Sequence, residues 1–310
     1  MRKFKSKKRV ARKIFVKKDN NRKLSHSQNF FKEELDVRKL ISKTDISGSD
    51  AVVEIGSGTG IITNALLKKA GKVIAIELDD GLYSQLKINF KDNNNLILLN
   101  KNFLDWEPRK CEKYKIFSNI PFNTTADIIK RIVEVINPTP ISTYLIIQKE
   151  AAEKYLLQKD KNSLLSVVYY PIYNIQIIKE ISRFAFKPIP RVSIVLLSIK
   201  KRMSPLIKHD DYVLFKDFVS FCFSSWKKNL KENLLTLLSE KQVSRFVNKS
   251  LLNKKPSQLN FDEWILIFNY FKNNTDKMGF NNIFGTWRKI KKQQQNLSKR
   301  HRTTKLMRKK

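Results

Sequence analysis

The segment Glu54-Ile-Gly-Ser-Gly-Thr-Gly60 limits the possible folds of this chain more than any other. It follows a short apolar run at 51–55 and precedes an amphipathic stretch at 61–70, so its order is strand, glycine loop, helix. Glycines let the main chain turn sharply and approach a ligand closely. Their spacing here differs from the G-x-G-x-x-G form of dinucleotide-binding loops. The segment therefore predicts a nucleoside-cofactor loop at the end of a buried strand.

Apolar runs alternate with amphipathic stretches over the first half of the chain. Strands are predicted at 51–55, 72–76, 96–99, 114–117 and 142–147, and helices at 33–43, 61–70, 80–91, 124–136 and 149–157. This alternation predicts an α/β fold, with a Rossmann-like, doubly wound sheet and helices on both faces. Three later runs are also strand-like and could add an antiparallel edge: 166–170, 175–178 and 192–197.

The character of the sequence changes again near Lys200–Pro205, a polar and basic segment that we expect to separate two domains. Beyond it, amphipathic patterns predict a small all-helical domain with helices at 211–239, 240–252 and 261–272. We expect four parts: a basic arm at 1–24, the α/β domain with the cofactor loop at 25–200, a small helical domain at 201–287 and a basic tail at 288–310. The low-complexity start of that tail predicts disorder in the free protein.

The chain is extremely basic, with 62 Lys and Arg against 28 Asp and Glu and a formal net charge of +34. Residues 1–24 hold 12 of these cations and one acid, and residues 288–310 hold 11 and no acid. Such an excess favours a polyanionic partner, and nucleic acid is the first choice. A membrane surface is the alternative, although no run of 18 apolar residues predicts a membrane span.

The only cysteines are Cys111 and Cys222, which give neither a metal-ligand spacing nor a disulfide framework. We expect no metal site and a cytoplasmic protein. The N-terminus lacks the apolar segment of a secretory signal. A mitochondrial leader is a weaker alternative, because lysine dominates the segment and no Ser-rich amphipathic pattern is present.

Two polar residues at predicted strand ends are suited to hold an adenosyl cofactor. Glu77 ends the second strand, and an acid at that position can bind both ribose hydroxyls. Asn102 follows the third strand, where its amide could bond the adenine edge. The alternatives without a binding role are that Glu77 is an ordinary surface carboxylate and that Asn102 is a solvated loop residue.

The tetrapeptide Asn119-Ile120-Pro121-Phe122 follows the fourth strand and is suited to hold a planar amine. The Asn119 side-chain carbonyl and the Ile120 main-chain carbonyl could accept the two amine protons, and Pro121 restricts the geometry of Ile120. The Phe122 ring could stack on the base. Phe186 could cover the other face of the base, although Phe184 is an alternative and a core position is equally open.

The motifs together resemble the ribosomal RNA adenine N6-methyltransferases, and most closely the erythromycin-resistance (Erm) branch. The matching segments occur in order: 27–30, 54–60, 77–79, 100–103, 114–122 and 186–192. The resemblance implies S-adenosylmethionine as methyl donor, one 23S rRNA adenine as acceptor, naked or in pre-ribosomal particles, and resistance to macrolides, lincosamides and streptogramin B. It also implies cofactor contacts at matching positions: Asn29, Phe31, Gly56, Glu77, Asn102 and Asn119. We expect a monomer.

The sequence departs from that family at position 102, which is usually Asp, and at Phe122, which is often Tyr. Two alternatives stay open: the 16S rRNA adenine dimethyltransferase of small-subunit biogenesis, and a non-catalytic RNA-binding ribosome-assembly factor. Ser27, where the 16S group favours Gly, and Ile120, where Leu is common, favour the resistance branch. The intact pocket residues argue against pure RNA binding.

Overall fold

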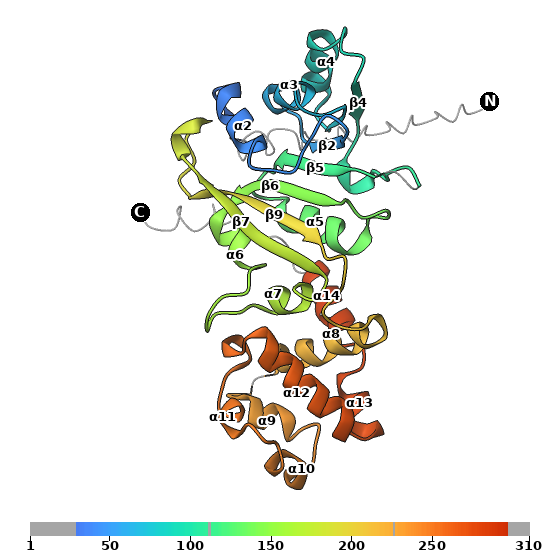
Figure 1. Cartoon of the computed structure of the whole chain (residues 1–310), viewed down its shortest axis with the longest axis vertical. Helices are drawn as coiled ribbons and strands as arrows, with labels where there is room; N and C mark the ends of the chain where they lie inside the picture. The colour runs from blue at the N-terminus through green and yellow to red at the C-terminus, as the bar shows by residue number, and fades with distance from the viewer. Residues whose placement is uncertain (1–28, 111–112, 226, 297–310) are drawn as a thin grey trace, which may run out of the picture.

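The computed structural model describes residues 29–110, 113–225 and 227–296. Its centre is a seven-stranded sheet with the order β4-β3-β2-β5-β6-β9-β7 (Figure 1). The strands are β2 (Ala51–Ile55), β3 (Lys72–Glu77), β4 (Leu96–Asn100), β5 (Lys115–Asn119), β6 (Ser142–Gln148), β7 (Tyr173–Ile181) and β9 (Ile194–Lys201). The first five run parallel, whereas β9 pairs antiparallel with both β6 and β7.

The five parallel strands confirm the sequence prediction, and so does the antiparallel edge formed by β7 and β9. The prediction of a strand at 166–170 is wrong, because residues 166–169 lie in helix α7 (Leu164–Tyr169) and Tyr170 is its C-cap. Ser163 begins this helix with a capping box, since its side chain accepts from the Ser166 amide and the Ser166 hydroxyl accepts from the Ser163 amide. A cap of this kind outweighs the β preference of a Val-Val-Tyr-Tyr run.

Successive residues of the buried strands face opposite sides of the sheet, as the two-residue period of a strand requires. Val52 packs with α2 (Glu34–Ile41) and α3 (Ile61–Leu67) on one face. Val53 packs on the other face with α5 (Thr125–Lys130), the π-helical turn η3 (Arg131–Val135) and α7. Two further helices follow β3 and β6: α4 (Asp80–Asn89) and α6 (Lys149–Glu153). Helices on both faces explain why these strands are mainly apolar on both sides rather than alternating between apolar and polar residues.

A group of helices lies below the sheet in Figure 1 and shares its hydrophobic core. It comprises α8 (His209–Ser224), α9 (Leu230–Leu234), α10 (Glu240–Ser244), α11 (Lys249–Leu252), α12 (Phe261–Asn274), α13 (Lys277–Ile283) and α14 (Thr286–Asn296). Aromatic side chains join α8 to α12, with the Phe218 and Phe271 rings stacked 4.7 Å apart. Each such buried ring contributes roughly 1.5–3 kcal/mol of transfer free energy.

Two of the predicted long helices are broken into shorter ones. The prediction of one helix at 211–239 is wrong in its middle, where Ser225 is extended and Asn229 begins α9 by accepting from the Glu232 amide. The predicted helix at 240–252 is likewise divided into α10 and α11. Asn and Ser bond neighbouring main-chain groups and so begin helices as readily as they interrupt them.

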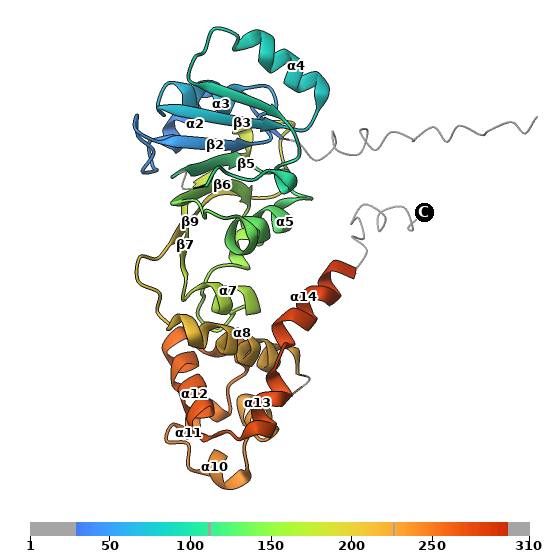
Figure 2. The same cartoon turned by 90° about the vertical axis from the view of Figure 1, so that its right-hand side faces the viewer.

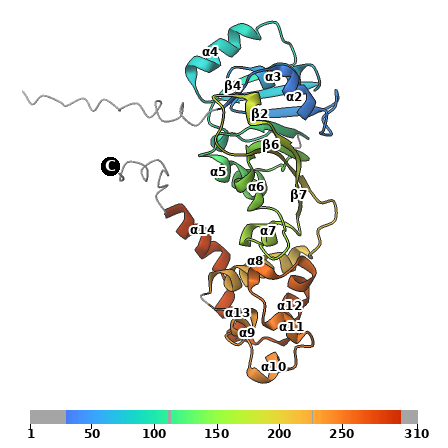
Figure 3. The same cartoon turned by 90° about the vertical axis from the view of Figure 1, so that its left-hand side faces the viewer.

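The prediction of a disordered tail from residue 288 is wrong for its first part, because residues 286–296 form helix α14. Figures 2 and 3 show α14 rising from the helical region towards α5. The Trp287 ring packs edge-on against Tyr169 of α7, with ring centroids 6.2 Å apart. The expected arm at 1–24 and the residues after 296 lie outside the described part of the chain. Among the described residues, no helix combines the length and apolar character needed to cross a membrane.

Candidate active site at the carboxyl ends of β2 and β5

The strand order places a cleft between the carboxyl ends of β2 and β5. The chain proceeds from β2 outward to β3 and β4, and then returns to β5 on the other side of β2. Open α/β sheets bind ligands at such a reversal of direction. Pairing of β2 with β5 extends only over Val52 with Lys115 and Val53 with Ile116. Further along, the Ser118 hydroxyl accepts from the Ile55 amide at 2.9 Å and donates to the Ile55 carbonyl at 2.5 Å.

The glycine loop fits between these strand ends because of its main-chain conformation. Gly56, Gly58 and Gly60 all have positive φ angles, of 71°, 56° and 86°. A Cβ on Gly58 would lie 2.7 Å from the Phe30 ring, which covers the loop. Phe30 was not singled out from the sequence, because nothing in its surroundings indicates that a ring must lie against this glycine.

One of two adjoining cavities has a volume of about 340 Å³ and lies at the ends of β2, β3 and β4. Glu77 lines it and is almost fully buried. One Glu77 carboxylate oxygen accepts from the Gly58 amide at 2.7 Å, and the other accepts from the Asp79 amide at 2.9 Å. Each carboxylate oxygen keeps a second lone pair, so a fixed pair of acceptors can meet two adjacent hydroxyl groups.

Asn102 lines the same cavity, but its oxygen already has a structural role. Its Oδ1 accepts from the Leu104 amide at 3.0 Å and begins the short 3₁₀ turn Phe103–Asp105. The side-chain NH₂ and the second lone pair of Oδ1 are therefore left for a ligand.

Glu54 lies behind the glycine loop and is buried. Burial raises the pKa of its carboxyl to about 8, although Thr63 donates a hydrogen bond of 2.5 Å to it. The carboxyl is therefore mainly protonated in the folded protein at neutral pH.

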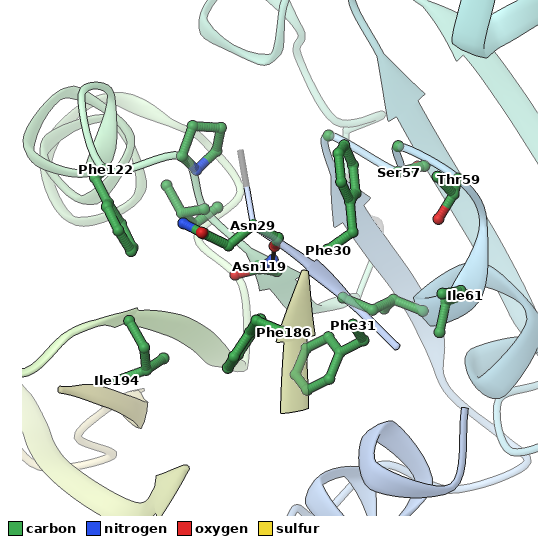
Figure 4. A pocket seen from close by; sticks show the side chains of 15 residues that line it. Asn29, Phe30, Phe31, Ser57, Thr59, Ile61, Asn119, Phe122, Phe186 and Ile194 are labelled. Atoms are coloured by element: carbon green, nitrogen blue, oxygen red, sulfur yellow. Dashed lines mark hydrogen bonds between the residues drawn. The ribbon is translucent and has the colours of Figure 1, made fainter. Parts of the chain in front are cut away.

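The second cavity lies between the glycine loop and the tetrapeptide Asn119–Phe122, which we call the acceptor tetrapeptide (Figure 4). Asn119 Nδ2 donates to the main-chain carbonyl of Asn29 at 2.7 Å. This bond fixes the orientation of the amide and leaves Oδ1 as a free acceptor. The Ile120 amide donates to the Ile146 carbonyl at 3.1 Å, which holds the peptide to β6. The Ile120 carbonyl has no hydrogen-bond donor within the described part of the chain.

Aromatic rings form much of the wall of this cavity. The two-residue strands β1 (Phe30–Phe31) and β8 (Phe186–Lys187) pair with each other in antiparallel orientation. In this pairing Phe31 lies opposite Phe186. The rings of these two residues are 4.5 Å apart, and Phe186 is only 1% exposed. In Figure 4 the Phe122 and Phe186 rings lie on two sides of an opening that Asn119 borders. Phe184 is 68% exposed and does not line the cavity.

The structure brings the residues predicted from the sequence together in these two cavities. Those lining the cavity of Figure 4 are Asn29, Phe31, Gly56, Asn119, Ile120, Phe122 and Phe186. Gly56, Glu77 and Asn102 line the other, and the two cavities meet at Gly56 and Pro121. Phe30 and Ile194 also line the cavity of Figure 4 and were not expected as site residues, although Phe30 ends the matching segment 27–30. No cluster of three potential metal-ligating side chains occurs among the described residues.

The arrangement fits an adenosyl ligand that carries an amino-acid chain. The 340 Å³ cavity combines the Glu77 acceptor pair with apolar walls from Leu78, Phe103 and Ile128, as a ribose and a flat base require. The glycine loop connects it to the second cavity. A reactive atom at the junction would lie beside Gly56 and Pro121, next to the acceptor residues.

The comparison with protein families gives a match over residues 19–273 to the model described as "Ribosomal RNA adenine dimethylase". The chain is 32% identical over 224 residues to ribosomal RNA small subunit methyltransferase A of Mycoplasmopsis pulmonis, covering 71% of this chain and 86% of that protein. It is 31% identical over 261 residues to the protein of the same name from Thermotoga neapolitana, covering 83% of this chain and 95% of that protein.

Two solved structures share the fold. The 23S rRNA methyltransferase ErmE superposes with a TM-score of 0.70 and 22% identity, over 79% of this chain and 100% of that one. A dimethyladenosine transferase from Plasmodium falciparum superposes with a TM-score of 0.66 and 22% identity, over 79% of this chain and 98% of that one. Both likenesses extend through the sheet and the helical region, and at this level of identity they concern the fold.

Proposed function

This chain belongs to the ribosomal RNA adenine dimethylase family, and we propose that it transfers methyl groups to the exocyclic N6 of an adenine in ribosomal RNA. The observation that carries the proposal is the Asn119 amide, which the Asn29 carbonyl orients at 2.7 Å. The free Asn119 oxygen then lies where a flat base entering the cavity of Figure 4 would present its amine.

Members of this family use S-adenosylmethionine, which when bound supplies an electrophilic methyl group on a sulfonium. The Glu77 carboxylate would bind the ribose hydroxyls, and the loop around Gly56 would hold the amino-acid chain. Asn102 would offer its NH₂ to the adenine edge. Because main-chain amides fix Glu77, the protein's contribution on this side is binding and orientation.

On the acceptor side, the Asn119 oxygen and the Ile120 carbonyl would each accept one proton of the target amine. Both bonds favour a more tetrahedral nitrogen whose lone pair points towards the cavity junction. The amine is neutral before attack, so no general base is needed for the nitrogen to act as nucleophile. The extra proton on the product nitrogen is acidic and can leave to water.

A base in a duplex has to leave the stack to reach this cavity, at a cost of a few kcal/mol. Stacking on the half-buried Phe122 ring would offset part of that cost, by roughly 1–3 kcal/mol. We propose Phe186 as a wall against the opposite side of the base. It is held by Phe31 and therefore acts as a fixed surface rather than as a movable lid.

We propose small-subunit (16S) ribosomal RNA as the substrate to test first. The support comes from relatives of above 30% identity, which are named for the small subunit and are covered over most of their length. The expectation of a 23S substrate rests on the residue resemblance alone, since the ErmE likeness concerns the fold.

The second candidate substrate is an adenine of 23S rRNA, with resistance to macrolides, lincosamides and streptogramin B as the consequence. Ile120 favours it, because its side chain stands in the acceptor tetrapeptide where Leu is common in the 16S group. It is 1% exposed, so its shape affects the packing behind the target amine.

The deciding experiment offers purified protein and labelled donor to 30S particles, 16S transcript and 23S transcript, and then maps the modified nucleotide by reverse-transcription stops. We expect an adenine of one RNA to be modified at its Watson–Crick edge. Incorporation into neither RNA by folded protein that binds the donor would contradict the proposal. Protein that binds RNA but not the donor would be the non-catalytic assembly factor.

The same assay tests the cofactor site. We expect Glu77→Ala to raise the KM for the donor, because two fixed acceptors for the ribose are lost. Wild-type donor affinity in this variant would contradict the proposed role of Glu77 in binding the donor.

A further inference from the structure

Helix α14 lies beyond the residues that match the family, which end at 273, yet it is firmly attached to the rest of the molecule. Its start is held by Asp217, a buried carboxylate on α8. The two Asp217 oxygens accept from the Gly285 amide at 3.0 Å and from the Trp287 amide at 2.9 Å. An acid at this position also stabilises the positive end of the helix dipole.

The inner face of α14 is joined to the methyltransferase half. Trp287 packs against Tyr169, and Lys291 forms an ion pair with Glu134 of the π-helical turn η3. The side chains of Lys291 and Glu134 are both less than one fifth exposed. Tyr169 also donates a hydrogen bond to Glu134, so one carboxylate holds α7 and α14 together.

The outer face of α14 is a basic surface. Arg288, Lys289 and Lys292 are all exposed, and their spacing of one and four residues places them on one side of the helix. No acid occurs between residues 286 and 296. Because the inner face is anchored, these three charges have a fixed position rather than the wide distribution of a loose arm.

Glu134, the ion-pair partner of Lys291, is also close to the active site along the chain. Glu134 lies nine residues after Thr125, the first residue of α5, which itself follows Phe122 by three residues. Nine residues of helix span about 14 Å. Figures 2 and 3 show α14 and α5 on the same side of the molecule.

We propose that the outer face of α14 binds the phosphate backbone of the ribosomal RNA whose adenine occupies the active site. This inference rests on the proposed function for the identity of the RNA. Charge complementarity selects a polyanion, and the fixed site of attachment makes α14 a second point of contact that sets how the RNA approaches the acceptor cavity.

The test measures binding of a labelled 16S transcript by the full chain as a function of salt. The variant R288Q/K289Q/K292Q removes three charges. Each lost phosphate contact should reduce the slope of log affinity against log salt by about 0.7–0.9. We therefore expect a slope smaller by about 2 and an affinity at 0.15 M salt lower by roughly 50-fold, with donor affinity unchanged.

The matched control, K69Q/K87Q/K91Q, removes three exposed charges near α3 and α4, at the other end of the molecule. We expect its salt slope to stay close to that of the wild type. Equal losses in the two triple variants would mean that only total charge matters, and a wild-type slope for R288Q/K289Q/K292Q would overturn the proposal.

Trp287→Ala tests the anchoring separately, because it keeps every charge. We expect a loss of RNA affinity approaching that of R288Q/K289Q/K292Q, with retained donor binding showing that the protein is folded. Wild-type RNA affinity in Trp287→Ala would show that α14 acts as a flexible tether and would contradict the fixed placement. If the wild-type chain binds no ribosomal RNA, the proposed function fails before this inference is reached.

Discussion

The carboxyl edge of the sheet and the helical region present functional groups in two different ways. At the sheet edge, main-chain groups hold the side chains: the Gly58 and Asp79 amides hold Glu77, and the Asn29 carbonyl holds Asn119. In the helical region, the whole helix α14 is held by Asp217 of α8 and, across the boundary with the sheet domain, by side chains of α7 and η3. The helix then carries exposed charges. Methyl transfer needs positions fixed within a fraction of an ångström, whereas phosphate binding needs only charge in the right area.

This comparison predicts that single changes at the sheet edge alter transfer or donor binding, and that those in the helical region alter RNA binding. The largest expected effect is that of Asn119→Ala, which removes the oriented acceptor for the amine. We expect kcat to fall by about 10²–10³, the size seen when one positioned polar group is lost from an active site. RNA affinity should change little.

Single-turnover transfer with labelled donor measures this loss, and Asn94→Ala, at an exposed loop asparagine, is the control. A parallel loss of RNA affinity and turnover in Asn119→Ala would show that Asn119 acts in binding, and the separation of the two regions would fail.

The next prediction concerns the pH dependence of stability through Glu54. Its folded pKa of about 8 lies above the ordinary value of 4.5, so the folded state binds the proton more tightly than the unfolded state. The stability from this group is complete below pH 4.5 and is lost as the pH rises to about 8. One pKa unit corresponds to about 1.4 kcal/mol, so the loss amounts to a few kcal/mol at most.

Glu54→Gln removes this titration, so the free energy of unfolding should depend less on pH between 5 and 8 than in the wild type. Urea unfolding without donor measures it, with the exposed Asp92→Asn as a control. Identical pH profiles for Glu54→Gln and the wild type would mean that the buried group is ionised in the folded protein.

Gly58→Ala should weaken donor binding by about tenfold or more, because an alanine at φ 56° is strained and its Cβ would lie 2.7 Å from the Phe30 ring. Gly48→Ala is the matched control, since a Cβ there meets nothing within 4 Å. Calorimetric titration with the donor compares the two variants. Equal affinities would show that the loop and Phe30 adjust freely and that main-chain geometry does not define this half of the site.

The smallest effect is expected for Asn102→Asp, and it is a gain. The aspartate would keep the cap on Leu104 with one oxygen and offer the other as an acceptor to the adenine amine. We expect several-fold tighter donor binding, equivalent to about 1 kcal/mol. Asn94→Asp controls for the added charge. Weaker binding in Asn102→Asp would indicate that the amide NH₂ donates to a ring nitrogen of the adenine.

Local patterns predicted the sheet well and the helical region poorly, for a physical reason. Strands buried on both faces are apolar throughout, and glycine and polar residues mark their ends, so 51–55 and 72–76 could be recognised. The run at 166–170 has equal β preference but is helical, since the Ser163–Ser166 cap decides it locally. The break after α8 comes where Asn229 begins a new helix by accepting from the Glu232 amide, and a hydrophobic period does not reveal such a cap.

The sequence by itself determined the chemistry of the site, because glycine loops and polar strand ends require particular residues at particular positions of the chain. Tertiary structure alone decided which atoms of those residues are free. The Asn29 carbonyl, 90 residues away in sequence, orients the Asn119 amide and leaves its oxygen facing the cavity. Tertiary structure also decided that the start of the basic tail forms the attached helix α14. The carboxylates that hold this helix, Asp217 and Glu134, lie far from it in the sequence and contact it only in the folded protein.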